Sequence, residues 1–397
     1  MIIELHILQN FAPSNLNRDD TGSPKDCEFG GYRRARISSQ CYKRAIRQTF
    51  GSQGLIEPDK LASRTKRLVD ELSRRLIDRG KDQELARRVV ENILNGIELK
   101  TKDDGKTQYL LFLGQTEIEK LSQLCFDYWD KLVEIVPQAP ANDETGAKKT
   151  KSKDAKKESA KAIPSEIKNA TLNVLDGGRA VDLALFGRML ADLPEKNIDA
   201  ASQVAHAIST NKASMEFDFY TAVDDLRPDD NQGSDMLGTI EFNSSCFYRY
   251  ANLDVRQLLS NLGNDRELAH RAVQGFITAA VTAVPTGKQN SMAAHNLPSF
   301  VMVVIREKGF WSLANAFTKP VRPSGDGDLI ENSIRSLDSY WKGLAEMYGQ
   351  NQISKCFVAS LREEGLDNLK PARCSNLKEV IDNTMDLLGN SILEIQS

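Results

Sequence analysis

The stretch that decides the fold is FGGYRRARISSQCYKRAIRQTF, residues 29–50, in which a glycine-containing loop leads into a strongly basic helix. Ser38 and Ser39 are good N-caps, because a serine hydroxyl can accept a hydrogen bond from an amide of the first helical turn. From Gln40 to Phe50 the apolar residues recur at helical spacing. The predicted apolar stripe is Tyr42, Ala45 and Ile46. The predicted outer face carries Gln40, Lys43, Arg44 and Arg47.

A strand is predicted before this helix. Residues 2–9 alternate apolar with polar side chains, for example Leu5 and Ile7 with His6 between them. Such alternation is typical of a β-strand. Residues 10–32 are rich in Asn, Asp, Gly and Pro, and they are predicted to form a long loop. Long loops inside compact domains are often functional.

After the basic helix the pattern becomes helical from about 58 to 136, and again from 164 to 173. Between them, residues 148–161 read KKTKSKDAKKESAK, which predicts a flexible basic segment because it offers almost no apolar side chains to bury. Residues 187–211 mix short apolar runs with turns.

A projecting hairpin is predicted further along the chain. Residues 215–223 alternate, with Met215, Phe217 and Phe219 on one side and Glu216, Asp218 and Tyr220 on the other. A polar turn at 229–235 separates them from a second strand-like, aromatic stretch at 238–251. The remaining predictions are a helix at 266–283, a buried strand at 300–305, and helices at 331–349 and 376–393.

Composition narrows the class of protein. The chain has 397 residues, 40% of them hydrophobic, which is enough for a sizeable core or two. It shows no apolar run near the ~20 residues of a membrane span and no signal peptide, so we expect a cytoplasmic protein. The six cysteines are scattered without C-x-x-C pairs or nearby histidines, which argues against a zinc site or a disulfide framework.

Charge is unevenly distributed. The formal net charge of -3 argues weakly against nucleic-acid binding. Residues 33–47, however, hold six basic residues and no acid: Arg33, Arg34, Arg36, Lys43, Arg44 and Arg47. A helix N-terminus receives phosphates well because its amides are free and its dipole is positive there. The alternative interpretation is a basic helix face that simply meets water.

Two further elements have the same ambiguity. Apolar side chains on a projecting hairpin can stack on the bases of a single strand, although large apolar residues are more often core. The candidates there are Met215, Phe219, Tyr220 and Leu237. Residues 285–291, PTGKQNS, offer Lys288 beside a flexible glycine, but they are too short for a phosphate-cradling P-loop and could be a surface turn.

Candidates for catalysis are few. The four histidines have no metal-ligand spacing, and His6 and His206, which sit among small or apolar neighbours, are interpreted as structural. Adjacent acids in loops can hold Mg²⁺, but they more often cap turns or pair with arginine. Those pairs are Asp19–Asp20 and Asp224–Asp225. We therefore expect no metal, no cofactor and no enzymatic activity.

At this point the chain resembles a known family. The residues that carry the resemblance are NLNRDD (15–20), Lys25–Asp26, FGGYRRARISSQ (29–40) and KRAIR (43–47), followed by GRM (187–189), AHAI (205–208), YTAVDD (220–225), LGT (237–239), FYRYAN (247–252), Val284–Pro285, GKQ (287–289) and ANAF (314–317). They are similar, in order and over nearly the whole chain, to the CasC (Cse-type) subunit. That subunit is the crRNA-binding backbone of the type I-E CRISPR Cascade complex.

The resemblance implies an α+β, hand-shaped protein. Its ferredoxin-like (RRM-like) palm would comprise residues 1–57, a palm or web region 176–211, and residues 243–397 with the C-terminal helices. A helical fingers domain would occupy 58–175 with a flexible basic loop at 141–163, and a β-hairpin thumb would occupy 212–242. About six copies would stack head to tail along the crRNA with other Cascade subunits, leaving most bases free to pair with target DNA.

Matched position by position, the resemblance implies two sets of site residues. The RNA-backbone set is Arg18, Lys25, Ser38, Gln40, Lys43, Arg44, Arg47, Lys288 and Arg322. The base-contacting set is Met189, Phe219, Tyr220 and Leu237. Phe219 stands where the family more often has tryptophan, residues 148–161 have no counterpart, and the segment after about Gly349 matches poorly.

Two rival interpretations remain. One is a metal-dependent, target-RNA-cleaving backbone subunit of a type III-like effector, for which the acid pairs named above would be the candidates. The other is a separate RRM-type RNA chaperone, but the chain lacks the aromatic sheet motif of that class. The long predicted hairpin would also have no purpose in an RNA chaperone of that kind.

Overall fold

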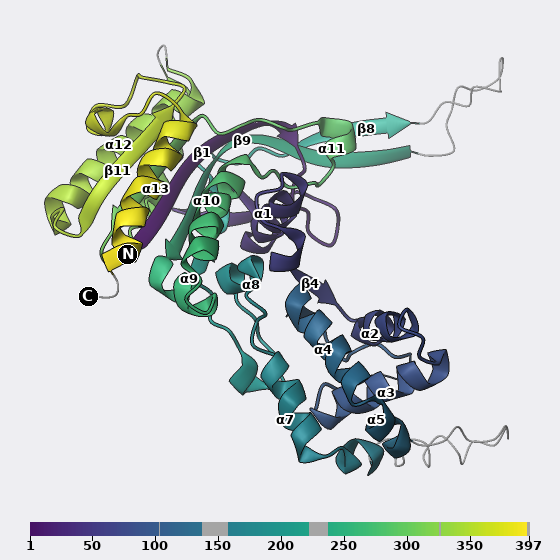
Figure 1. Ribbon diagram of the computed structural model, residues 1–397. Coiled ribbons are helices and arrows are strands. Elements are labelled where there is room, and N and C mark those ends of the chain that lie inside the picture. Colours follow the sequence, from purple (N-terminus) through teal and green to yellow (C-terminus); the bar gives the residue numbers. More distant parts are fainter. Residues whose placement is uncertain (103, 137–157, 222–236, 325–326, 395–397) are drawn as a thin grey trace, which may run out of the picture. The chain divides into compact units, whose positions relative to one another are not determined.

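The computed structural model describes residues 1–102, 104–136, 158–221, 237–324 and 327–394 (Figure 1). Contacts divide the chain into two compact units. The first comprises Met1–Leu55, Ser202–Arg256 and Arg266–Ser397, and the second comprises Ile56–Ala201 and Gln257–Asp265. The first contains an antiparallel sheet with helices and the second is mainly helical, so the predicted α+β class is confirmed. The finer division into palm, fingers, web and thumb stays a prediction.

The first unit is built on one sheet with the strand order β11-β10-β1-β9-β7-β3-β2. Two more strands, β6 and β8, also pair with β9, and every pairing between these strands is antiparallel. The strands are β1 (Ile2–Ser14), β2 (Asp26–Phe29), β3 (Tyr32–Ile37), β6 (Ser202–Val204), β7 (Ala207–Ser209), β8 (Glu216–Thr221), β9 (Leu237–Asp254), β10 (Phe300–Arg306) and β11 (Ile353–Ser360).

The centre of this sheet has the ferredoxin-like pattern. Along the chain the elements run β1, α1 (Ser39–Ser52), β7, β9, α10 (Arg266–Thr282) and β10. In space the strands lie in the order β10-β1-β9-β7. That chain order and spatial order define a ferredoxin-like βαββαβ sheet, as predicted. Helices α1 and α10 pack against each other, so the basic outer face of α1 belongs to a helix anchored on the sheet.

Helices cover both faces of the central strands. Successive residues of a strand point to opposite faces, so Ile7 and Leu8 of β1 identify the two sides. Leu8 is in a core cluster with Ile334 and Leu337 of α12 (Leu329–Tyr348). Ile7 is in a cluster with Val281 of α10 and with Leu377, the first residue of α13 (Leu377–Glu394).

Because both faces are covered, even polar residues of β1 such as Glu4 and His6 are buried. His6 is fully buried, and its Nδ1 lies 2.9 Å from the hydroxyl of Tyr248. Glu4 accepts hydrogen bonds from the Tyr250 hydroxyl at 2.7 Å and from the Trp311 amide at 2.6 Å. These contacts give the interior of the sheet a polar network beside its apolar core.

A two-stranded ribbon extends from this sheet. Strand β8 pairs with the first third of β9 in a register that runs from Glu216 opposite Phe242 to Thr221 opposite Leu237. Figure 1 shows the ribbon running out past the helices of the first unit. The predicted hairpin strands are therefore confirmed, and the predicted turn at 229–235 lies outside the described residues.

The second unit surrounds a helical core. Its helices are α2 (Leu68–Ile77), α3 (Gln83–Gly96), α4 (Gln115–Asp127), α5 (Trp129–Ile135), α7 (Ser165–Val174) and α8 (Val181–Phe186), and α9 (Val255–Asn261) ends in it. Between them, β4 (Ala62–Thr65) and β5 (Leu111–Gly114) form a two-stranded sheet. The prediction of continuous helix from 58 to 136 was therefore wrong at these two strands. Residues 158–162 are also helical, so the predicted flexible basic segment ends earlier than 161.

Short elements complete the described chain. They are the helix α11 (Gln289–Met292) and 3₁₀ turns at Pro58–Lys60, Pro194–Lys196, Ala314–Phe317 and Lys370–Ala372. The loop predicted at 10–32 was too long, because β1 continues to Ser14 and β2 starts at Asp26. Within the ranges described above, no helix combines the length and apolarity required to span a bilayer.

Candidate nucleic-acid interface

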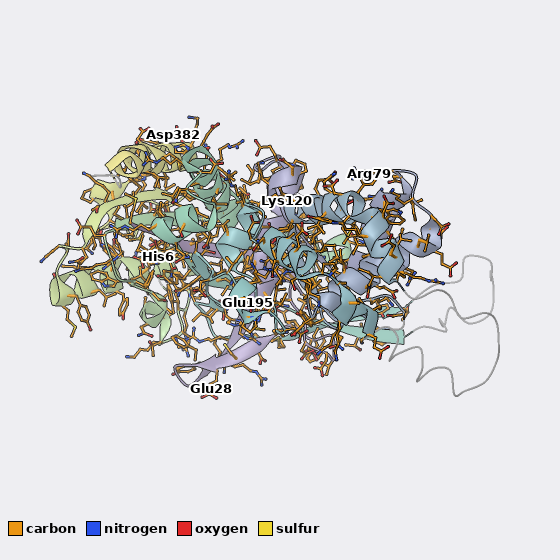
Figure 2. All side chains as sticks on the ribbon, turned by 60° about the horizontal axis from the view of Figure 1, so that its bottom comes forward. His6, Glu28, Arg79, Lys120, Glu195 and Asp382 are labelled. Atoms are coloured by element: carbon orange, nitrogen blue, oxygen red, sulfur yellow. The ribbon has the colours of Figure 1, made fainter. Side chains whose placement is uncertain are left out.

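A hairpin of β2 and β3 carries the first three of the six basic residues at 33–47, and it separates two neighbouring arginines. Figure 2 shows Glu28 on the outer side of this hairpin. Adjacent residues in a strand face opposite sides, so Arg33 and Arg34 cannot share a surface. The exposed Arg33 forms an ion pair with Asp26 at 2.5 Å, whereas Arg34 is fully buried.

Arg34 is a structural residue. Its guanidinium donates hydrogen bonds to the carbonyl oxygens of Ser209 (2.9 Å), Thr210 (2.8 Å), Phe317 (2.6 Å) and Thr318 (3.2 Å). A buried arginine needs such acceptors because its charge cannot be lost. Arg34 therefore joins β3 to the end of β7 and to the end of the 3₁₀ turn at 314–317. Of the six basic residues that concentrate positive charge at 33–47, Arg34 is therefore not available at the surface.

The exposed basic residues of this region line a surface pocket of about 950 Å³. Four cations, four acids and two apolar side chains from the root of the ribbon contribute to it. The cations are Arg18, Lys25, Arg33 and Arg36, and the acids are Asp19, Asp20, Asp26 and Glu241. The apolar side chains are Met215 and Phe217, and Ser23 and Pro24 also line the pocket. The structure thus places two of the predicted RNA-backbone-binding residues, Arg18 and Lys25, beside the apolar residues of the ribbon, Met215 and Phe217.

Two of the four acids in the pocket have partners within the protein. Asp26 pairs with Arg33, as described above. The Asp19 carboxylate accepts hydrogen bonds from the Thr21 hydroxyl at 2.7 Å and the Thr21 and Ser23 amides at 2.9 and 3.0 Å. These bonds, led by the Thr21 hydroxyl, lower the pKa of Asp19. Asp19 is therefore a turn-capping carboxylate.

The N-terminus of α1 lies beside the pocket. As predicted, Ser38 is the N-cap, and its hydroxyl accepts a hydrogen bond from the Cys41 amide at 3.3 Å. The Ser38 amide donates to the Asn17 side chain at 2.8 Å, which fixes the 15–18 segment against the helix. On α1 itself, Tyr42, Ala45 and Ile46 are buried as predicted. Gln40 and Arg44 are exposed, and Lys43 and Arg47 are partly exposed.

The loop that carries Lys288 approaches the same segment. A β-carbon added to Gly287 would lie 2.3 Å from the carbonyl oxygen of Leu16, so this position requires glycine. The thiol of Cys41 at the start of α1 points to that same Leu16 oxygen, at 3.9 Å. Lys288, with a left-handed φ of 52°, directly follows this close approach. The turn predicted from the sequence is therefore fixed near the basic helix.

One polar residue at this surface was not predicted. The exposed His206, between β6 and β7, has its Nδ1 3.1 Å from Nη1 of Arg36 and 3.3 Å from the amide of Ser39. Burial, followed by the charges of Arg36 and Lys25, lowers the pKa of His206. The sequence interpretation of His206 as a purely structural residue missed this placement, because its partners lie about 170 positions earlier in the chain.

The ribbon extends the apolar part of the pocket. Met215 and Phe217 line it, and strand alternation places Phe219 on the same side of β8 as Phe217. Phe217 and Phe219 are 67% and 64% exposed, which is unusual for large apolar side chains. Tyr220 faces the opposite side, where its ring occupies the space left by Gly238 on β9. The structure thus places Phe219 and Tyr220, two residues of the predicted base-contacting set, on opposite sides of β8.

The other predicted residues lie elsewhere or outside the description. Arg322 is exposed but is not among the pocket's lining residues; its backbone follows Val321, whose amide donates to Thr210. The side chain of Leu237 and both Asp224 and Asp225 fall outside the described residues. In the part of the chain that the structure describes, no group of three His, Cys, Asp or Glu residues is placed to hold a metal ion.

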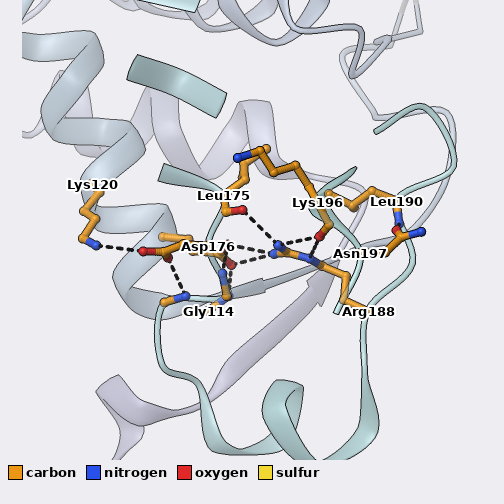
Figure 3. Close-up of polar contacts among 11 residues, drawn as sticks. Gly114, Lys120, Leu175, Asp176, Arg188, Leu190, Lys196 and Asn197 are labelled. Atoms are coloured by element: carbon orange, nitrogen blue, oxygen red, sulfur yellow. Dashed lines mark hydrogen bonds and ion pairs between the residues drawn. The ribbon is translucent and has the colours of Figure 1, made fainter. Parts of the chain in front are cut away.

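Met189 belongs to the second unit and is 77% exposed. Its neighbour Arg188 is fully buried, and its Nη1 lies 2.8 and 2.9 Å from the two carboxylate oxygens of Glu117 on α4. Figure 3 shows the Arg188 guanidinium also donating to the carbonyl oxygens of Leu175 and Lys196. The loop that exposes Met189 is therefore fixed by a buried ion pair one residue away.

Together these features define an α+β protein with a ferredoxin-like sheet, a projecting ribbon that exposes aromatic side chains, and a pocket at the ribbon's root lined by basic and acidic side chains. The chain belongs to the CT1975-like protein family, whose model matches residues 3–385. No curated protein matches its sequence.

Two solved structures are similar over nearly the whole chain. One is a chain of a "CRISPR RNA-guided surveillance complex, pre-nicking", with 29% sequence identity and a TM-score of 0.82. The other is a chain of a "CRISPR RNA-guided surveillance complex", with 26% identity and a TM-score of 0.72. Each alignment covers 98% of this chain and 100% of the other.

Proposed function

We propose that this protein is the crRNA-binding backbone subunit of a CRISPR RNA-guided surveillance complex of type I-E. The single observation that carries the proposal is the pocket that joins Arg18, Lys25 and Arg36 to the apolar residues of the ribbon. A single-stranded RNA presents phosphates on one side and base faces on the other, so basic side chains beside exposed aromatic rings suit it. Two of the acids in the same pocket, Asp19 and Asp26, already have partners within the protein. The similarity to chains of such complexes supports the same role.

The RNA would be gripped without its sequence being read. Lys43 and Arg47 lie one turn apart on α1 and can follow successive phosphates. Lys288 adds a cation from the loop fixed against Leu16. Phe217 and Phe219 would meet bases along one side of β8, and the bases between would remain available to pair with target DNA.

We further propose that about six copies assemble head to tail on one crRNA with other subunits, because a heterologous contact that does not close on itself generates a helical array. The subunit would act as a scaffold rather than an enzyme. The use of the Asp19 carboxylate in capping the 19–23 turn supports this over a metal-dependent cleavage role.

The test is to express the chain with its operon neighbours and a CRISPR array, and to sequence the RNA that copurifies with it. Discrete RNAs of one repeat-spacer unit are expected, and they should be lost when Lys43→Glu and Arg47→Glu are combined. The matched control is Lys308→Glu with Lys355→Glu, two exposed lysines of the first unit that lie outside the pocket and α1. A chain that purifies without RNA, or with mixed RNA unaffected by the first pair, would refute the proposal.

A further inference from the structure

His206 occupies a junction between the strand and the helix that carry the proposed RNA-binding groups. Its neighbours in the chain are anchored in the sheet, since Ile208 of β7 pairs with Arg36 of β3. From this position the ring reaches the Arg36 side chain and the first amide of α1, that of Ser39. One ring nitrogen, Nδ1, is thus shared by two donors from two elements.

The donors decide the protonation state of the ring. An arginine side chain has no acceptor, and a backbone amide donates only, so Nδ1 of His206 must be the acceptor in both contacts. A nitrogen that accepts has no proton, so the imidazole is neutral and its proton is on Nε2. In the RNA-free chain, His206 therefore holds two donors that are also well placed to bind a phosphate.

The charged side chains that act most strongly on the ring are positive, although Asp26 and three other acids line the same pocket as Arg36 and Lys25. Arg36 on β3 and Lys25 on the segment before β2 face it, and the N-terminus of α1 adds a partial positive charge. Both cations, after burial, oppose protonation of His206. A bound phosphate would neutralise this field and would also offer better acceptors to Arg36 and to the Ser39 amide than an imidazole does.

We propose that an RNA phosphate takes over the Arg36 and Ser39 donors, and that the displaced His206 ring takes up a proton from solvent and forms an ion pair with that phosphate. The inference rests on the proposed RNA-binding function and adds to it a residue and a proton linkage. Only one proton moves, from water to Nδ1, and no covalent bond to the RNA forms or breaks.

The sign of the effect follows from linkage. The bound complex would hold one proton more than the free components near neutral pH, so lowering the pH favours binding. Each unit by which RNA raises the pKa of His206 tightens binding up to about tenfold at a pH below both pKa values. When RNA raises the pKa of His206 by about one unit within the ordinary histidine range, the affinity for RNA at pH 6 should be at least about threefold higher than at pH 8.

The experiment measures the affinity of the purified full chain for a short single-stranded RNA between pH 6 and 8 at constant salt. Calorimetry in two buffers of different ionisation enthalpy would count the protons taken up. The wild-type chain should bind tighter at pH 6 and take up protons. His206→Ala should flatten the pH profile, abolish the proton uptake, and bind at pH 8 at least as well as the wild type, because the competing acceptor is gone.

The control is His270→Gln on α10, which should keep the wild-type pH profile. Binding with the same pH dependence in the wild type and in His206→Ala would overturn the His206 inference and leave the proposed function intact. Weaker binding of His206→Ala at pH 8 would also overturn it, since a neutral His206 would then be a direct contact. Absence of RNA binding by every variant and the wild type would instead overturn the proposed function.

Discussion

Nη1 of Arg188 lies 2.8 Å from Oε1 and 2.9 Å from Oε2 of Glu117, and both side chains are completely buried. Glu117 also accepts the backbone amides of Gly177 at 2.7 Å and Gly114 at 2.8 Å. The pair therefore joins α4, the end of β5 and the loops around Met189. Such a pair is costly to break, because the remaining charge has no compensation in the interior.

Glu117→Gln should therefore destabilise the second unit by about 3–5 kcal/mol. The measurement is the midpoint of chemical denaturation, followed by tryptophan fluorescence, to which Trp129 in the core of that unit contributes. The control is Lys120→Gln on the same helix, whose pairing with Asp176 at 3.6 Å is half-exposed and should contribute less than about 1 kcal/mol. Equal stability of the two variants would contradict the structural role of the pair.

The two faces of the ribbon should differ in their effect on RNA binding. Phe217→Ala and Phe219→Ala should each weaken binding by about 1–3 kcal/mol, the usual loss when a stacked aromatic ring is removed. Affinity for a single-stranded RNA measures this, with Tyr220→Ala on the opposite face as the comparison. A loss confined to Tyr220→Ala would show that the RNA does not follow the face that leads from the pocket.

Lys25 should contribute one phosphate contact. For single strands each such contact changes the slope of log affinity against log salt by about 0.7, so Lys25→Ala should flatten the slope by that amount. The measurement is RNA affinity between low and moderate salt. Lys308→Ala, away from the pocket, should leave the slope unchanged. An unchanged slope for Lys25→Ala would remove this residue from the RNA-contacting set.

Gly287→Ala should disturb the Lys288 loop. The added carbon would lie 2.3 Å from the Leu16 carbonyl oxygen, closer than atoms can approach, so the loop or the 15–18 segment must move. We expect lower thermal stability and weaker RNA binding. Gly343→Ala in α12, where the added carbon meets nothing within 4 Å, should instead stabilise the protein by about 0.5–1 kcal/mol. A neutral Gly287→Ala variant would refute the close approach.

Stability should fall below neutral pH because of His6. Burial, with a smaller effect of Arg306, lowers the pKa of His6 to about 3. The folded chain therefore resists a proton that the unfolded chain accepts near pH 6.5, and stability is lost as pH falls. His6 alone should remove about 2 kcal/mol between pH 7 and 5. The raised pKa of Glu4, which is also mainly due to burial, acts in the opposite direction at lower pH.

The measurement is the free energy of unfolding at pH 7 and pH 5 for the wild type and His6→Gln. The difference in free energy of unfolding between the wild type and His6→Gln should shrink as pH falls, because glutamine does not titrate. A parallel loss in both would assign the pH dependence to other groups.

The sequence predicted the strands and helices that follow a clear period, but it could not reveal those whose pattern is too short. Strand β4 has four residues, ASRT, and pairs with the four-residue β5 in a two-stranded sheet, so the helical pattern around them dominated. Recognising residues 32–37 as a strand would have placed Arg33 and Arg34 on opposite faces. The role of His206 could not be predicted in this way, because its partners come together only in the folded sheet.

Strand β9 has a consequence for how such proteins can diversify. It runs unbroken for 18 residues, about 60 Å, with one end in the ribbon and the other beside β1 in the sheet. The ribbon can therefore be lengthened without altering the sheet, but only by two residues per strand at a time, since a single insertion reverses every side chain beyond it. Over evolutionary time or in engineering, its reach would change in steps of about 7 Å.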